Sequence, residues 1–182
     1  GIKKAAGSVA AQIASRSFLN QKFPWVILPA SKEEEFMLAA LKEAWKAFQL
    51  NEVPVGAVLV KEEKIIARGH NQVELLQDAT AHAELLCLTT AEAALENWRL
   101  KGATLYCTME PCAMCAGAMF LTRIDQLVWG APDLRHGANG SWVDLFANKH
   151  PMHQIKITNG ILQEYSAQLM RDFFRLQRQK KA

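Results

Sequence analysis

Two short motifs constrain this chain more than any other feature. His-Ala-Glu occupies residues 82–84, and Pro-Cys-Ala-Met-Cys occupies residues 111–115. Because Cys112 and Cys115 are three positions apart, one helical turn brings both sulfur atoms toward the same point. A proline suits the first position of that turn, where its missing N–H would have no partner. The polar residues just before His82 are typical of a helix start, so we expect a second helix to open there.

These motifs supply three metal ligands and one spare carboxylate. Thiolate and imidazole are ligands that zinc prefers, and three protein ligands leave the fourth tetrahedral position for water, as in catalytic sites. Zinc can lower the pKa of that water to about 7. Glu84 is not needed as a ligand, so it can carry a proton between the water and a leaving group. We therefore predict one zinc ion per subunit, held by His82, Cys112 and Cys115, with Glu84 as the catalytic acid and base.

Two further cysteines leave other interpretations open. Cys107 could complete a closed structural zinc site, but it lies in the apolar run 104–109, which is typical of a buried strand. Cys87 lies among leucines, and a small apolar packing role suits both cysteines. Four cysteines in a chain of 182 residues do not indicate a disulfide framework. The open site with three ligands is the favoured interpretation.

Charge is distributed unevenly along the chain. Its composition, 50% hydrophobic and 21% charged, is typical of one globular domain that buries a core without disulfides. The segment 171–181 carries five basic side chains and one acidic one, an excess larger than the net charge of +3 for the whole chain. A basic tail on a slightly acidic body favours a polyanionic partner, nucleic acid first. No apolar run approaches about 18 residues, so we expect neither a transmembrane helix nor a membrane partner.

Residues 1–30 differ in composition from residues 31–182, which we take as the folded domain. The first acidic residue is Glu33, and the basic and serine residues before it could be the remnant of an organelle transit peptide. A flexible extension and residues foreign to the natural chain are the alternatives. Segment 23–29 is apolar between two prolines, and we expect it to lie on the body as an extended segment outside the sheet.

Helical and strand patterns alternate along the folded domain. Ser31 and Glu34 have the spacing of a capping box that starts the first helix. We expect helices at 31–50, 82–98, 112–123 and 163–180, and strands at 55–60, 64–69, 104–109, 126–131 and 154–158. This order, α-β-β-α-β-α-β-β-α, predicts an α/β fold with a central five-stranded sheet covered by helices on both faces. A long glycine-rich loop at 132–151 is of the kind that carries function.

The spacing H-x-E…P-C-x-x-C resembles the signature of the zinc deaminases, the cytidine deaminase-like superfamily. Within it, residues 33–178 resemble bacterial-type tRNA-specific adenosine deaminases, notably at residues 52–58, at Asn71 and at residues 78–84. The resemblance implies a three-layer α/β/α fold with a mixed five-stranded sheet. It also implies a homodimer that deaminates adenosine to inosine at the wobble position, 34, of a tRNA anticodon, using one zinc ion per subunit. The compartment implied is the bacterial cytoplasm, or an organelle if residues 1–30 are a transit remnant.

The resemblance further implies which residues contact the anticodon stem-loop. Asn71 stands where the family has its base-contacting asparagine, and Asp133 falls on the family's substrate loop. The full set of expected substrate contacts is Val55, Asn71, Ala83, Glu110, Asp133, Phe173, Phe174, Arg175 and Arg178. Pro132 and His136 depart from the usual residues of that loop, which leaves its contacts open.

The last helix has features that suit RNA without any resemblance. Arg171, Arg175 and Arg178 share one helical face, and aromatic rings beside basic groups suit single-stranded RNA. Phe173, however, is in step with leucines about one turn away on each side, so a core position is equally compatible. In the helix 112–123, a run of apolar side chains would suit a homodimer interface, although these positions are equally compatible with core: Met114, Met119, Phe120 and Leu121.

Two other functions remain in play. A deaminase of small molecules such as guanine or cytosine would keep the same zinc site and Glu84, but it gives no reason for the basic last helix. A zinc-bearing RNA-binding module without catalysis would have no use for Glu84.

Overall fold

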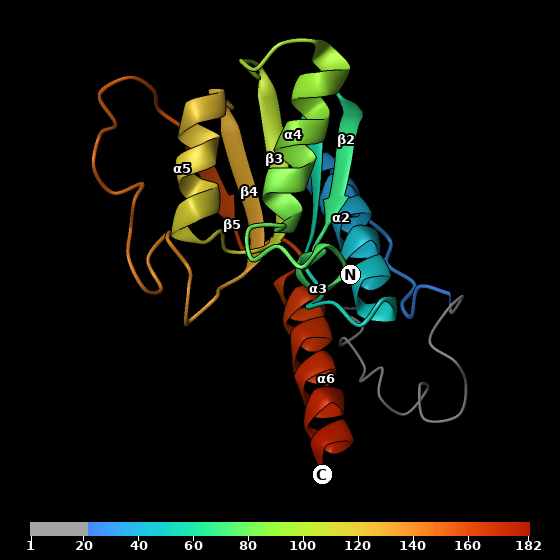
Figure 1. The fold of residues 1–182 in the computed structure, drawn as a ribbon. Coiled ribbons are helices and arrows are strands. Elements are labelled where there is room, and N and C mark those ends of the chain that lie inside the picture. The colour runs from blue at the N-terminus through green and yellow to red at the C-terminus, as the bar shows by residue number, and fades with distance from the viewer. Residues whose placement is uncertain (1–21) are drawn as a thin grey trace.

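A computed structural model describes residues 22–182 and gives ten elements along the chain (Figure 1). The helices are α2 (Lys32–Gln49), α3 (Val73–Leu76), α4 (Ala83–Leu95), α5 (Ala113–Thr122) and α6 (Gln163–Lys181). The strands are β1 (Gly56–Lys61), β2 (Lys64–His70), β3 (Ala103–Met109), β4 (Gln126–Ala131) and β5 (Lys156–Asn159). The transit-peptide interpretation falls mainly on residues 1–21, which lie outside the described residues.

The five strands form one mixed sheet in the order β2-β1-β3-β4-β5. β1 runs antiparallel to β2 and β3, whereas β3, β4 and β5 are parallel to one another. Each parallel connection needs a crossover, and α5 supplies the one between β3 and β4. The predicted mixed five-stranded sheet is confirmed.

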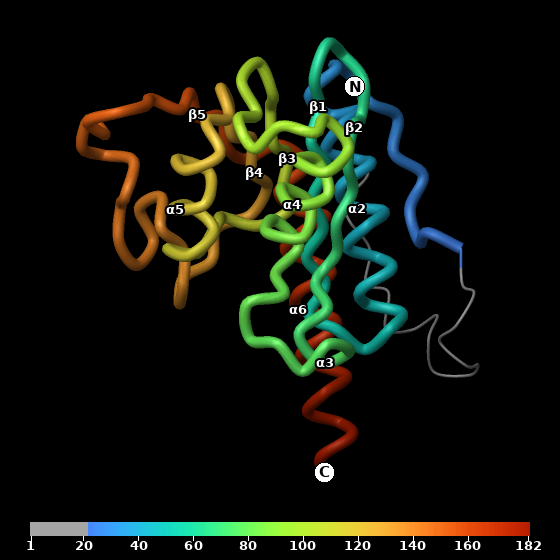
Figure 2. Tube along the Cα trace, turned by 45° about the horizontal axis from the view of Figure 1, so that its top comes forward, coloured from blue at the N-terminus to red at the C-terminus, as the bar shows by residue number. Residues whose placement is uncertain are grey.

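Helices cover both faces of the sheet, as the element order predicts. α4 and α5 lie on one face, and α2 lies on the other together with the first part of α6, whose remainder projects beyond the sheet (Figures 1 and 2). One core cluster fills the space under α4 and α5, including Cys87, Cys107 and Met119. Two others lie on the α2 side, one of them between α2 and α6. The three-layer α/β/α architecture is confirmed.

The N-terminal end of α2 is capped as the sequence indicates, with one difference. The hydroxyl of Ser31 accepts a hydrogen bond from the Glu34 N–H at 3.1 Å. The Glu34 carboxylate reaches one residue further back and accepts from the Ala30 N–H at 2.7 Å. Ahead of this cap, the extended segment lies outside the sheet, as predicted. Phe23, Trp25 and Ile27 alternate inward to pack on the cluster between α2 and α6.

One element and two boundaries differ from the predictions by more than a residue. α3 was not expected; the Glu52 carboxylate starts it by accepting the N–H groups of Glu74, at 3.1 Å, and Leu75, at 2.6 Å. α4 ends three residues early because Glu96 adopts a left-handed conformation, with φ 50°. β5 begins at residue 156 rather than 154. Between residues 22 and 182, no helix is both long and apolar enough to span a membrane.

Candidate active site

The metal-ligand candidates sit at the N-terminal ends of two helices on the same face of the sheet. His82 is the N-cap of α4, Cys112 is the N-cap of α5, and Cys115 lies in the first turn of α5. Neither cap side chain bonds its own helix, which leaves imidazole and thiol free to face each other. The partial positive charge of a helix N-terminus also favours the thiolate form of cysteine.

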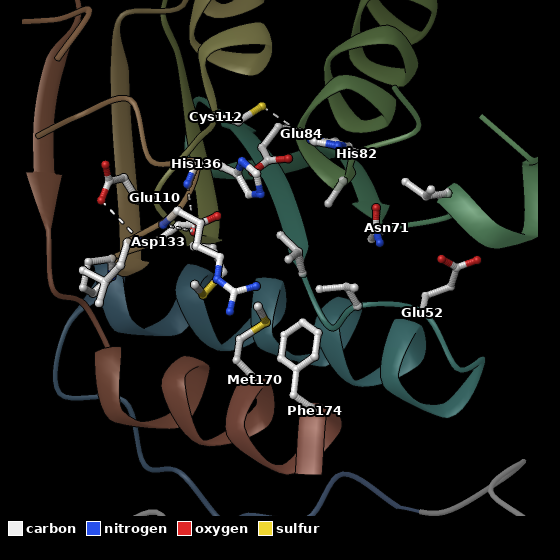
Figure 3. Close-up of a pocket in the computed structure, with 18 of the residues that line it drawn as sticks. Glu52, Asn71, His82, Glu84, Glu110, Cys112, Asp133, His136, Met170 and Phe174 are labelled. Carbon is white, nitrogen blue, oxygen red and sulfur yellow. Dashed lines mark hydrogen bonds between the residues drawn. The ribbon is translucent and has the colours of Figure 1, made fainter. Parts of the chain in front are cut away.

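The three ligand atoms converge on one point. The His82 Nδ1 atom lies 3.5 Å from Cys112 Sγ (Figure 3) and 3.6 Å from Cys115 Sγ. All three ligand atoms lie within 4.8 Å of one another. Two sulfurs and one imidazole nitrogen at this spacing fit a zinc ion. Within the described part of the chain, no other side chain joins this group. Cys87 and Cys107 are fully buried in the core, so the closed structural site is not formed.

The two site cysteines share a proton in the metal-free chain. The pKa of Cys112 is lowered to about 4, chiefly because the Cys115 thiol donates to its sulfur and secondly because of His82. The same bond and burial raise the pKa of Cys115 well above the usual range. Contact with the Cys112 thiolate also raises the pKa of His82. The pocket therefore already holds one thiolate ready for a cation.

Glu84 lies beside the three ligands without joining them. It is in the first turn of α4 and only 4% exposed. Its carboxylate accepts a hydrogen bond from the Cys115 thiol at 3.5 Å. Burial raises the pKa of Glu84. A carboxyl group whose pKa is shifted upward at the edge of a cleft suits proton transfer near neutral pH.

The cleft next to this group has a volume of about 1460 Å³ and brings most of the predicted residues together (Figure 3). Eight of the nine expected substrate contacts line it: Val55, Asn71, Ala83, Glu110, Asp133, Phe174, Arg175 and Arg178. Asn71 is 7% exposed, and its backbone N–H donates to the Val55 carbonyl at 3.1 Å. Arg175 bonds the buried carboxylate of Asp172 at 2.5 Å.

Phe173 is the predicted residue that the structure does not bring to the cleft. It is 6% exposed and packs edge-on against Phe48, with ring centroids 5.9 Å apart. Phe173 therefore occupies a core position, which its helical spacing had left equally open. Phe174 is 42% exposed and points into the cleft (Figure 3).

The Glu110 carboxylate accepts hydrogen bonds from the loop that follows β4. It accepts the backbone N–H groups of Asn139, at 2.9 Å, Ser141, at 3.2 Å, and Asp133, at 3.4 Å. The Ser141 hydroxyl also donates to it. A side chain at Gly137 would overlap this carboxylate, because Gly137 lies directly against it. Glu110 thus lines the cleft, but its hydrogen bonds order the loop.

The same loop is joined to the zinc-ligand turn. The Ala138 N–H donates to the Pro111 carbonyl at 2.8 Å, and Gly137 pairs with Cys112 in an isolated bridge. The first part of the segment 132–151 is therefore more regular than its glycine content suggested. The cleft residues that sequence analysis did not predict include Glu52, Trp142 and Met170. For Trp142 the only available signal was a large aromatic side chain in a glycine-rich loop.

Comparisons with known proteins place this site in a family context. Residues 30–131 match the family model of the cytidine and deoxycytidylate deaminase zinc-binding region. The tRNA-specific adenosine deaminase of Bacillus subtilis is 46% identical over 151 residues, which cover 83% of this chain and 94% of that protein. The chloroplastic tRNA(adenine(34)) deaminase of Arabidopsis thaliana is 49% identical over 160 residues, which cover 79% of this chain and 12% of that longer protein.

A solved structure gives the same picture at the level of the fold. It comes from a study of A-to-I editing by tRNA:A34 deaminases at the wobble position of transfer RNA. It matches with a TM-score of 0.71 and 43% identity, covering 74% of this chain and 98% of that one.

Proposed function

Because the chain belongs to the zinc-binding cytidine and deoxycytidylate deaminase family, and within it to the tRNA-specific adenosine deaminases, we propose that it deaminates adenosine 34 of a tRNA anticodon to inosine. One observation carries this proposal. His82, Glu84 and Cys112 lie on one side of the cleft, and Met170 and Phe174 of α6 lie on the other (Figure 3). Three arginines of the same helix, Arg171, Arg175 and Arg178, also line the cleft. The residues proposed for catalysis and those proposed for RNA binding thus line one cavity.

The chain's own residues supply the proton transfers. Zinc, held by His82, Cys112 and Cys115, would provide a water molecule with a pKa near 7. Glu84 accepts a proton from the attacking water and delivers protons to the ring nitrogen N1 and to the departing amino group. At C6 a C–O bond forms and a C–N bond breaks, so adenosine and water give inosine and ammonia.

Asn71 orients the base before the reaction. Its backbone is fixed by the bond to Val55, and its side chain lines the cleft on the His82 side (Figure 3). An amide both donates and accepts hydrogen bonds, so it can pair with the polar edge of a purine. The target adenosine lies in an anticodon loop and needs no unpairing, which keeps the cost of inserting it to a few kcal/mol or less.

The size of the cleft and the arginines that α6 contributes to it favour RNA over a free base. A volume of about 1460 Å³ exceeds that of usual small-molecule pockets, roughly 300–1,000 Å³. Arg171, Arg175 and Arg178, all on α6, line the same cleft, and a free base carries no phosphate for them to bind. These arginines can bind the phosphates on either side of the target nucleotide.

Inosine formation on a synthetic anticodon stem-loop tests the proposal. We expect turnover on the stem-loop and none on free adenosine, guanine or cytosine under the same conditions. Turnover confined to a free base would replace the tRNA assignment with a small-molecule deaminase. Tight RNA binding without any turnover would indicate a binding module instead.

We also propose that the protein works as a homodimer. Leu121 on α5 is 70% exposed and Met152 is 72% exposed, and apolar surface of this kind is what a subunit interface would cover. Of the other α5 residues considered for this interface, Met119 and Phe120 are buried in the subunit itself. Sedimentation of the zinc-loaded protein distinguishes a dimer from a monomer.

The cellular compartment rests on residues 1–30. The bacterial and chloroplastic relatives support two settings, the bacterial cytoplasm and an organelle. Uptake of a fluorescent protein fused to residues 1–30 by isolated chloroplasts or mitochondria supports the organelle. Absence of uptake would show that residues 1–30 are not a transit signal.

A further inference from the structure

Trp142 presents an uncovered aromatic ring at the cleft. It lines the cavity that contains the metal ligands, yet it is 63% exposed. Within residues 22–182, its ring stacks on no other aromatic ring and its indole N–H donates no hydrogen bond. A singly exposed apolar side chain needs no partner by itself, but this ring lies in the cavity lined by His82, Glu84 and Cys112, where it can contact whatever binds there.

The backbone that carries this ring is held firmly. The Trp142 N–H donates to the Gly137 carbonyl at 2.9 Å. Its neighbour Ser141 bonds the buried Glu110 carboxylate through both its backbone N–H and its hydroxyl. A ring mounted on an ordered backbone loses little conformational entropy when it binds a flat partner.

The surroundings of Trp142 identify the partner by its chemistry. The same cavity is lined by Arg135, Arg171 and Arg178, which would attract phosphates, and by the half-exposed ring of Phe174. Bases of single-stranded RNA stack on aromatic side chains, whereas their phosphates seek arginine. Within the proposed function, we infer that Trp142 is a stacking platform for a nucleotide adjacent to adenosine 34.

The test measures binding rather than turnover. The full-length, zinc-loaded protein carries Glu84→Gln in every sample, so no product forms, and the probe is a fluorescently labelled anticodon stem-loop. We expect Trp142→Ala to raise the Kd about 5- to 150-fold, as for loss of one stacked base. Trp142→Phe, which keeps a ring, should stay within about threefold of the parent.

A matched control uses another exposed tryptophan. Trp98 is 50% exposed, its ring lies 4.0 Å from the Arg99 guanidinium carbon, and it does not line the cleft. Trp98→Ala should leave the Kd unchanged. An equal loss for Trp98→Ala and Trp142→Ala would assign both effects to general damage and overturn the inference.

Removing the RNA base identifies the stacked nucleotide. Stem-loops are made with an abasic site on one side or the other of adenosine 34. If Trp142 stacks on one of these bases, Trp142→Ala costs nothing further once that base is absent, because the two changes remove the same interaction. If the losses of binding free energy from Trp142→Ala and from the abasic site are fully additive at both positions, the inference is overturned. Dissociation of a dimer by Trp142→Ala would also overturn it, because the ring would then be a subunit contact. Binding is measured without turnover, so this test is separate from the test of the proposed function. Trp142 can prove unnecessary for binding while the wild-type protein still forms inosine. Trp142 can also prove necessary for binding in a protein that forms no inosine.

Discussion

Glu84 lies beside the zinc-ligand candidates but is not needed to bind the metal. It is buried beside the cluster, bonds Cys115 and faces the cleft. We expect Glu84→Gln to keep zinc and stem-loop affinity while lowering kcat by several orders of magnitude, because an amide cannot carry the proton. Metal analysis and RNA titration serve as the controls. A variant with near-normal turnover would remove Glu84 from the chemistry.

Glu110 is the second buried carboxylate of the site, and its role is to position the loop. Both of its oxygens accept hydrogen bonds from that loop. In Glu110→Gln the amide NH₂ group would face backbone N–H donors, which we expect to lower the free energy of unfolding by about 1–3 kcal/mol. KM for the stem-loop should rise more than kcat falls.

Urea denaturation and steady-state kinetics on the same preparation check this prediction. Glu62→Gln, which changes an exposed glutamate in the β1–β2 turn, is the matched control and should change neither quantity. Unchanged stability and KM in Glu110→Gln would show that its hydrogen bonds do not hold the loop.

At the scale of elements, α6 links the core to the RNA-binding side of the cleft. Leu169 and Phe173 anchor it against α2, and the arginines line the cavity. We expect Arg171→Gln combined with Arg178→Gln to weaken stem-loop binding and to reduce the slope of log Kd against log salt, by roughly 0.7 for each RNA phosphate that the variant no longer neutralises. Zinc content should not change.

The control for α6 removes the same charge elsewhere. Lys64→Gln combined with Arg68→Gln alters exposed residues of β2 that do not line the cleft. It should leave the salt slope close to that of the parent. Equal slopes for all three proteins would exclude α6 from the RNA interface.

Comparing the observed elements with the expected ones shows which features of this protein could be predicted from its sequence. The order of elements along the chain and the metal cluster follow from local signals, since the cysteines share one turn and His82 and Cys112 each start a helix. α3 was missed because its N-terminal end is capped by Glu52, more than 20 residues earlier. The loop after β4 looked irregular because its hydrogen bonds run to Glu110, on another element. Whether Phe173 faces the core or the cleft depended on where α2 packs, which helical spacing alone cannot decide.

At the scale of the whole molecule, the metal centre joins α4 to α5 across one face of the sheet. In the metal-free chain the two cysteines hold one proton between them, because the pKa of Cys112 is about 4 and that of Cys115 is raised. Zinc requires both sulfurs as thiolates and His82 as neutral imidazole. Zinc binding should therefore release the proton held by Cys115, and a further proton wherever His82, whose pKa is raised, is protonated.

The sign of the pH effect follows from that competition. Protons and zinc compete for the same atoms, so zinc should bind more weakly at pH 6 than at pH 8. At one fixed zinc concentration, the increase in Tm over the metal-free protein should then be larger at pH 8; a concentration 100 times the Kd stabilises by about 2.7 kcal/mol. Calorimetry in two buffers with different ionisation enthalpies measures the protons released. Cys87→Ala, which changes a buried cysteine outside the site, should lower Tm with or without zinc and leave the zinc-induced increase intact. Equal increases at both pH values, with no proton released, would contradict ligation by both Cys112 and Cys115.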